Sequence, residues 1–383
     1  MKSKRKILIL IPSLRGGGAE RTLINLLDKI DYARYDIDLV VVSKHGPYLD
    51  QIPEQVNVIY FYRLHIITRF LSFLHRKTGF DWFFRRKMKK LRKQYDVGIS
   101  FLDSTFTDFL FFTDIFDKRV ALVHSSYLSH EDYISSFQNP EYRKKVIAHR
   151  YSCLDAIYFV SHDSQNDFIE LFGDFPNVGV VYNLIDAESV IRKSLEPPGF
   201  KSESGFIFSA IGSLLPVKGF DRLIRAAKIA FDQGYQFELH IAGDGPEKKS
   251  LEKLIRQSGL KDIVTLHGFL DNPYPLLKLS DVFVMSSVSE ALPTVLCEAM
   301  ILEKPSLVTN CSGCRGLVES GEYGLMAEQD DNDLAQKMML YMDSPELLSY
   351  YSKKSAERSK LFNDSEILKS YYKIFDWEQI TDE

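Results

Sequence analysis

Residues 286–300 read SSVSEALPTVLCEAM, directly after an apolar run, Val282–Met285, that has the pattern of a buried strand. Pro293 suits the first turn of a helix, so we expect a helix from there to about Met300. Glu290 then lies in the loop before the helix, and Glu298 lies one to two turns inside it. Carboxylates at these places can hold sugar hydroxyls, while N–H groups at a helix start favour a diphosphate. The spacing alone fits two solvated glutamates around a buried helix equally well.

Three glycine turns precede this stretch, each after a predicted strand. Their sequences are GSLLPVKGF at 212–220, AGDGP at 242–246 and HGFL at 267–270. Open α/β sheets bind ligands at the carboxyl ends of their strands, so three such turns in succession favour a nucleotide site. Lys218 is placed to meet a phosphate as a point charge, and Ser213 can donate one hydrogen bond.

The amino-terminal half opens with a similar glycine turn after a predicted strand. Its first predicted strand is followed by PSLRGGGAER at 12–21, and then by a helical pattern. Glycines let the backbone approach a ligand closely, but this signal is weak by itself. The dinucleotide fingerprint G-x-G-x-x-G is absent, and Ser43-Lys44 ends the second predicted strand where an acidic residue would be required. A nicotinamide dinucleotide is therefore disfavoured as the ligand.

Short β-rich runs alternate with helical patterns along the whole chain, which predicts an α/β fold with parallel sheets. A chain of 383 residues fits two domains. Glu188–Ser204 contains Pro-Pro-Gly and has the composition of a linker. We therefore expect one Rossmann-like domain over 1–190 and a second over 205–365. The strands expected are 6–11, 37–42, 56–60, 97–101, 119–123, 156–160, 178–181, 206–211, 236–241, 263–267, 282–285 and 306–308.

Composition narrows the class of protein. With 45% hydrophobic and 26% charged residues, the chain is neither disordered nor a multi-span membrane protein. The amino-terminal apolar run is too short for a secretory signal, so we expect a cytoplasmic protein. Four cysteines suggest reduced thiols; Cys311 and Cys314 have redox spacing but no second pair beside them.

The segment from Arg63 to Lys93 is basic and aromatic, and Asp81 is its only acid. A basic helix with aromatic residues on its other face suits an anionic lipid surface, to which each cation contributes on the order of 1 kcal/mol. The alternative is a solvated basic face over a packed aromatic one. We expect membrane or acceptor contact through the cations Arg85, Arg86, Lys89 and Lys90. With a net charge of −4 and no recognisable module, nucleic acid is not an expected partner.

Together these motifs resemble glycosyltransferase family 4. Glu290 and Glu298 match the E-x7-E motif of retaining enzymes, and the glycine motifs at 16–21, 212–219 and 243–246 are similar to those of the family in order and spacing. The resemblance covers residues 6 to about 330. It implies the GT-B fold, in which two Rossmann-like domains face one another across an interdomain cleft. It also implies that a carboxyl-terminal helix, about 366–383, packs back on the first domain.

The resemblance also assigns roles to residues. Lys218 would bind the donor diphosphate, Glu298 the ribose, and Glu290 the transferred sugar, with His124 facing that sugar as a second catalytic residue. The remaining donor-binding residues would be Gly17, Ser213, Gly245, Phe269, Leu270, Ala291, Leu292, Pro293 and Thr294. Ser213 stands where many members carry arginine, and Arg15, Arg222 or Arg315 could replace that charge.

The function expected is transfer of a sugar, with retention, from a nucleoside-diphosphate sugar to a lipid-linked or surface-glycan acceptor at the cytoplasmic membrane face. A UDP-sugar is favoured as donor, and neither a metal nor another cofactor is required by this scheme. Two alternatives remain open: a NAD-dependent oxidoreductase, and a catalytically inactive regulatory subunit with the same fold.

Overall fold

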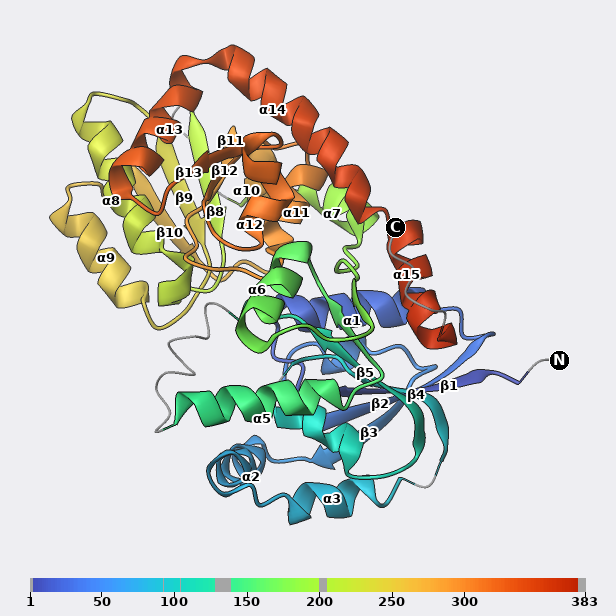
Figure 1. Cartoon of the computed structure of the whole chain (residues 1–383). Coiled ribbons are helices and arrows are strands. Elements are labelled where there is room, and N and C mark those ends of the chain that lie inside the picture. The colour runs from blue at the N-terminus through green and yellow to red at the C-terminus, as the bar shows by residue number, and fades with distance from the viewer. Residues whose placement is uncertain (1–2, 92, 104, 128–138, 200–204, 378–383) are drawn as a thin grey trace. The chain divides into compact units, whose positions relative to one another are not determined.

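The chain forms two compact units, each built around one parallel sheet (Figure 1). This computed structural model describes residues 3–377, except 92, 104, 128–138 and 200–204. The first unit comprises Met1–Leu184 and Asp364–Glu383, and the second comprises Ile185–Asn363. Two parallel sheets flanked by helices are the α/β architecture that the sequence predicts.

The first unit has a seven-stranded sheet in the order β3-β2-β1-β4-β5-β6-β7. The strand β1 is apolar along most of its length because both of its faces are covered. Ile7 and Ile9 point into one hydrophobic cluster, and Leu8 and Leu10 point into another on the opposite face. The strands are β1 Arg5–Ile11, β2 Tyr35–Ser43, β3 Asn57–Tyr62, β4 Tyr95–Ser100, β5 Phe116–Val123, β6 Ala156–Phe159 and β7 Val178–Val180.

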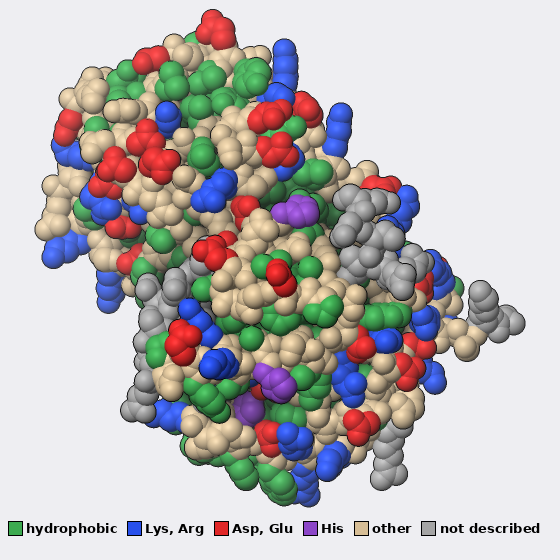
Figure 2. Space-filling view, in the orientation of Figure 1, with side chains coloured by type: hydrophobic (Ala, Val, Ile, Leu, Met, Phe, Trp, Pro, Cys, Tyr) green, Lys and Arg blue, Asp and Glu red, His purple; other side chains and the backbone are tan. Residues whose placement is uncertain are grey.

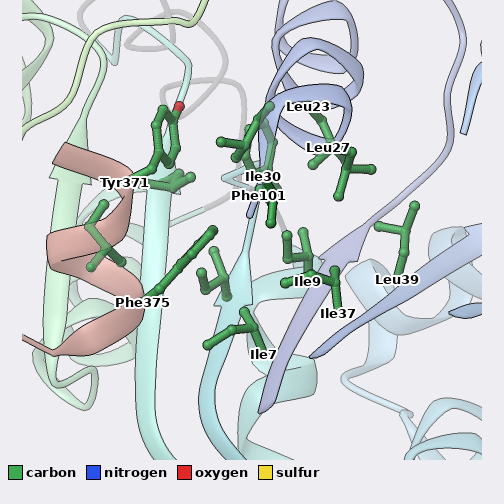
Figure 3. Packing of buried hydrophobic residues seen from close by; sticks show 14 of the residues in the cluster. Ile7, Ile9, Leu23, Leu27, Ile30, Ile37, Leu39, Phe101, Tyr371 and Phe375 are labelled. Atoms are coloured by element: carbon green, nitrogen blue, oxygen red, sulfur yellow. The ribbon is translucent and has the colours of Figure 1, made fainter. Parts of the chain in front are cut away.

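Helices cover both faces of this sheet. On one face, Leu23 and Leu27 of α1 and Tyr371 and Phe375 of α15 share a core with Ile9 (Figure 3). The other face is covered by α2, α3, α5 and α6. The helices of this unit are α1 Gly18–Lys29, α2 His65–Thr78, α3 Trp82–Met88, α5 Pro140–Ser152, α6 His162–Phe172 and α15 Asp364–Asp376.

The last helix, α15, belongs to the first unit although the whole second unit precedes it in the chain. The Lys29 ammonium lies 2.6 Å from the Asp364 carboxylate, and the Tyr35 hydroxyl donates to Asp376 over 3.0 Å. Phe375 is fully buried. Of the predicted helix 366–383, the part from 378 onward lies outside the described residues.

The second unit has a six-stranded sheet in the order β10-β9-β8-β11-β12-β13. The strand order reverses between β8 and β11, which is the position where open α/β sheets bind ligands. Its strands are β8 Ile207–Ile211, β9 Glu238–Ala242, β10 Val264–Gly268, β11 Val282–Met285, β12 Ser306–Thr309 and β13 Leu325–Ala327. Its helices are α7 Ala187–Ser194, α8 Phe220–Asp232, α9 Lys248–Gln257, α10 Tyr274–Leu279, α11 Thr294–Ile301, α12 Cys314–Val318, α13 Asp331–Asp343 and α14 Pro345–Arg358.

Two segments differ from the sequence prediction. The first half of the predicted linker is the helix α7, which buries Val190 and packs on α10 and α11. The basic segment is not one helix: α2 ends at Gly79, whose φ of 71° lies in the left-handed region, and α3 begins at Trp82. Neither these helices nor any other in the described ranges is both long and apolar enough to cross a membrane.

Candidate active site

Lys218 and Glu290 meet at the carboxyl edge of the second sheet. Lys218 follows β8, and Glu290 follows β11, so the two neighbouring strands at the reversal of strand order bring them together. The Lys218 Nζ lies 2.6 Å from Glu290 Oε1, and the Ser287 hydroxyl donates to the same oxygen over 2.7 Å. The side chains are 24% and 12% exposed. A carboxylate held by two donors in this way has one defined orientation.

Gly219 lets the Lys218 turn lie against the loop after β11. Its φ is 60°, and a Cβ there would stand 2.2 Å from the Ser286 carbonyl oxygen. The two segments are also tied by hydrogen bonds, because the Ser286 hydroxyl donates to the Lys218 carbonyl over 3.0 Å. Arg222 Nη1 donates to the Ser286 carbonyl over 3.1 Å. Only glycine fits at position 219 without moving this contact.

The loop that carries Glu290 is held from its other side by the segment after β12. The Thr309 hydroxyl donates to the Ser287 carbonyl over 2.5 Å, and the Glu290 N–H donates to the Ser312 carbonyl over 3.2 Å. Gly313 passes so close that a Cβ would lie 2.6 Å from the Glu290 carbonyl oxygen. The Glu290 backbone is therefore fixed from both sides before any ligand binds.

The turn after β9 packs closely on the turn after β8. A Cβ at Gly243 would lie 1.8 Å from the Gly212 carbonyl oxygen, and one at Gly245 would lie 2.5 Å from the Leu214 carbonyl oxygen. The glycines of this motif thus allow two strand-end turns to touch. Gly245 serves this packing, whether or not it also approaches a ligand.

The helix α11 starts beside Glu290 and carries Glu298. Pro293 is its N-cap residue rather than its first helical residue, and Thr294 begins the helix. Ala291, Leu292 and Pro293 are buried, so they offer backbone groups more than side chains. The first N–H groups of a helix have no intrahelical acceptor, which makes this start a place for an anion.

Glu298 is half-buried one to two turns into α11, where the Tyr274 hydroxyl donates to its Oε1 over 3.1 Å. Ser213 is exposed in the turn after β8. In the turn after β10, Phe269 is 74% exposed and Leu270 is half-buried. These residues lie in the same unit and follow strands of the same sheet as Lys218 and Glu290.

In the first unit, Gly17 is the N-cap of α1, and a Cβ there would lie 2.4 Å from the Glu20 carboxylate. Glu20 thus folds back over the glycine loop, and burial raises the pKa of its carboxyl group. The cations suggested as substitutes for the family arginine are engaged elsewhere: Arg15 contacts His65, and Arg315 donates to Asn310 over 2.9 Å.

His124 directly follows β5, as predicted. Its backbone N–H donates to Asp103 Oδ1 over 2.8 Å, and its ring lies 5.1 Å from that of Phe101. The residue as a whole is half-buried, but its Nε2 is buried and has no hydrogen-bond partner among the described residues. Burial lowers the pKa of His124 to about 3, so the ring is neutral at pH 7.

The four cations predicted to contact a membrane or acceptor are not equivalent. Arg85 is paired with Asp81 over 2.8 Å and lies over the Phe112 ring. Arg86, Lys89 and Lys90 are exposed. Figure 2 shows hydrophobic side chains with lysine and arginine beside them over α2 and α3. Apolar residues exposed there, by 41–76%, are Leu64, Ile66, Ile67, Phe70, Phe73, Phe80 and Trp82.

Sequence reasoning missed two contacts of the candidate site. Ser287 was part of the quoted stretch, but nothing in its spacing indicated that its hydroxyl would face Glu290. Tyr274 begins α10, four residues after the HGFL turn, and its hydroxyl reaches Glu298 on α11.

Two sequence models of known families match the chain, one in each half. The model described as "Glycosyltransferase Family 4" matches residues 16–189, and "Glycosyl transferases group 1" matches residues 192–358. The chain belongs to glycosyltransferase family 4. Membership in this family decides against the NAD-dependent alternative and identifies the chain as an enzyme.

Named relatives of this glycosyltransferase include a transferase and a synthase. It is 28% identical over 96% of its length to a Campylobacter jejuni protein, covering 99% of it: N-acetylgalactosamine-N,N'-diacetylbacillosaminyl-diphospho-undecaprenol 4-alpha-N-acetylgalactosaminyltransferase. It is 27% identical to N-acetyl-alpha-D-glucosaminyl L-malate synthase of Bacillus anthracis, with 58% of this chain and 59% of the relative covered.

Solved structures of the same fold include Anabaena HepE in complex with UDP and glucose. That chain has a TM-score of 0.72 and 19% identity, with 97% of this glycosyltransferase and all of HepE covered. TarM has a TM-score of 0.75 and 14% identity over 98% of this chain and 99% of its own. The fold is GT-B, as the sequence resemblance implied.

Proposed function

We propose that this glycosyltransferase moves a sugar, with retention at the anomeric carbon, from a UDP-sugar to a lipid-linked or surface-glycan acceptor. The observation that carries the proposal is the Lys218–Glu290 contact of 2.6 Å beside the start of α11. A cation, a carboxylate and the N–H groups of a helix start thus lie at the reversal of strand order, where a nucleoside diphosphate is expected to bind.

The chemistry follows from these groups. The acceptor hydroxyl oxygen forms a bond to the anomeric carbon on the face from which the diphosphate leaves, and the carbon–oxygen bond to the phosphate breaks. Lys218 and the N–H groups of α11 stabilise the negative charge that develops on the leaving phosphate. The hydroxyl proton passes to that phosphate oxygen, and Glu290 positions the sugar through its hydroxyls.

Two of the names above favour the donor and acceptor proposed. HepE was crystallised with UDP, and the Campylobacter jejuni relative is named for a diphospho-undecaprenol substrate. For this chain, the exposed apolar residues and cations of α2 and α3 favour an anionic bilayer surface as the place of reaction. We propose the cytoplasmic face of the membrane, where nucleotide sugars are found.

The test is thermal-shift binding with UDP, GDP, ADP and NAD in parallel. A ligand at a hundred times its dissociation constant stabilises the folded protein by roughly 2.7 kcal/mol. We expect stabilisation by UDP and none by NAD. Stabilisation by GDP or ADP alone would reject the UDP donor. Retention is checked separately from the anomeric configuration of the product by NMR, and an inverted product would reject it.

A further inference from the structure

The end of β3, the helix α3 and the turn after it line a hollow that contains none of the residues assigned to the donor. It has a volume of about 270 Å³ and is lined by Tyr62, Trp82, Phe83, Arg86, Lys87 and Lys90. None of these six lining residues is acidic. Sites for drug-sized ligands measure about 300–1,000 Å³, so this hollow suits a small head group rather than a whole sugar nucleotide.

The cations of the hollow are available for an anion. Neighbouring Arg85 is paired with Asp81, and Lys93 is paired with Asp36 over 2.8 Å and Asp38 over 3.2 Å. In the described part of the chain, by contrast, Arg86, Lys87 and Lys90 form no ion pair.

These three cations lie against aromatic rings and against one another. Arg86 lies over the Trp82 ring at 5.4 Å, and Lys87 lies over the Tyr62 ring at 5.1 Å. Arg86, near the end of α3, and Lys90, in the turn after it, are like charges that line the same hollow, so they repel. An anion in the hollow would convert that repulsion into attraction. A guanidinium with two ammonium groups and a tyrosine hydroxyl matches the oxygens of a phosphate.

The rim of the hollow is apolar, which a free inorganic anion would not use. Trp82 is 52% exposed and Phe80 is 48% exposed, and both rings pack edge-on against Phe83. Tryptophan at such an edge prefers the boundary between hydrocarbon and water. The ligand class that needs both features is a phosphate ester that also carries a hydrocarbon chain.

We infer that this hollow binds the phosphate groups of a lipid, with Arg86, Lys87 and Lys90 at the anion and Trp82 and Phe83 along the first carbons of the chain. The inference deepens the proposed function and rests on its lipid-linked acceptor. Two sources have the required chemistry: the diphosphate of a prenyl-linked acceptor, and the head group of an anionic phospholipid.

The experiment follows the fluorescence of Trp82, which lines the hollow. The chain has two tryptophans, so Trp377→Phe leaves Trp82 as the only indole. In this background, farnesyl diphosphate is titrated against the full chain, against Arg86→Gln with Lys90→Gln, and against the charge-matched pair Arg69→Gln with Lys77→Gln. Arg69 and Lys77 lie on α2, the helix before α3, and do not line the hollow. Two further titrations are made: one with vesicles that contain phosphatidylglycerol, and one with inorganic pyrophosphate in solution.

We expect the Arg86/Lys90 pair to weaken farnesyl diphosphate binding by about tenfold or more, and the matched pair by less than about twofold. If phosphatidylglycerol vesicles alone show this difference, the phospholipid is the source. Equal losses of affinity for farnesyl diphosphate in both pairs of substitutions would overturn the inference. Inorganic pyrophosphate that bound as tightly as farnesyl diphosphate would also overturn it. UDP binding to the same variants is measured in parallel. If the inference is overturned but UDP still stabilises the variants, the proposed function stands. If UDP does not bind the unsubstituted chain, the proposed function alone is rejected.

Discussion

One substitution at Glu290 can separate the structural role of its side chain from its role in the reaction. Glu290→Gln keeps the shape of the side chain, and its amide oxygen can still accept from Lys218 and Ser287. We therefore expect the free energy of unfolding to change by about 1 kcal/mol or less. Turnover should fall about 100-fold or more, because the charge that holds the donor sugar and Lys218 is lost.

Steady-state kinetics and chemical denaturation of the same preparation check both parts. Glu319→Gln, at an exposed position of the same unit, serves as control. Near-normal turnover in Glu290→Gln would remove Glu290 from the mechanism.

His124 makes the folded chain sensitive to acid. Its ring takes up a proton near pH 3 in the folded chain but near pH 6.5 in the unfolded chain. Between these values, the unfolded state binds more protons, so the free energy of unfolding falls as the pH is lowered from 6.5 towards 3. The loss from this residue is roughly 1 kcal/mol per pH unit.

We expect His124→Phe to flatten the dependence of unfolding free energy on pH in this range, measured by urea denaturation at pH 7, 6 and 5. His162→Phe is the control, since His162 is exposed at the start of α6. Parallel pH profiles for the chain and for His124→Phe would show that the ring is not buried as described.

Single residues also mark the limit of what the sequence could predict about the site. Lys218 and Glu290 were both assigned to the donor, but their direct contact spans 72 positions in the chain and depends on β8 and β11 being neighbours. Hydroxyl contacts such as that of Ser287 depend on a side-chain rotamer, which no spacing rule encodes.

At the scale of elements, the turn after β8 depends on a glycine that cannot be replaced. Gly219→Ala would force a methyl group against the Ser286 carbonyl in a left-handed conformation. Gly234→Ala is a matched control, because its φ is 91° but nothing lies within 4 Å of the added Cβ. Both glycines flank the same helix, α8.

We expect both substitutions to lower the free energy of unfolding by about 1–2 kcal/mol through backbone strain. Only Gly219→Ala should also weaken UDP binding, by about tenfold or more, because it displaces Lys218 from Glu290. Isothermal titration with UDP distinguishes the two. Equal UDP affinity in both variants would show that the close approach at Gly219 does not position the site.

The elements that the sequence predicted best are those with an unambiguous pattern. The run in β1 is apolar on both faces, which is typical of a central parallel strand. The strand β13, with three residues Leu-Met-Ala, has no β-branched residue and was missed. The helix α7 was taken as linker because Pro197 and Gly199 dominate the composition of the segment that follows it. In α2 and α3, continuous basic and aromatic composition hid the break at Gly79.

At the scale of the whole molecule, the net charge of the chain and the charge of the segment 63–93 lead to different predictions about anionic partners. The net charge of −4 predicts no attraction to an anionic partner, yet the acidic residues are almost absent from the segment 63–93. Charge recognition by this chain is therefore a property of one surface, and composition could indicate it only segment by segment. The same surface exposes apolar side chains, so the bilayer binding that we propose would have two components that respond differently to salt.

The apolar component can be tested apart from the phosphate-binding hollow. Ile66 and Phe70 are 76% and 64% exposed on α2, and neither lines the hollow. A large apolar side chain contributes about 1.5–3 kcal/mol when fully buried, so Ile66→Ser with Phe70→Ser should weaken binding to phosphatidylglycerol vesicles at least about tenfold. Leu195→Ser with Tyr350→Ser removes comparable exposed side chains from the second unit and should change binding by less than about twofold.

Vesicle sedimentation at low and high salt measures both components. Raising the salt should weaken binding of every variant. The loss caused by the α2 substitutions should persist at high salt, where charge is screened. If the α2 pair bound vesicles as the control pair does, α2 would not enter the bilayer surface, and membrane contact through this helix would be rejected.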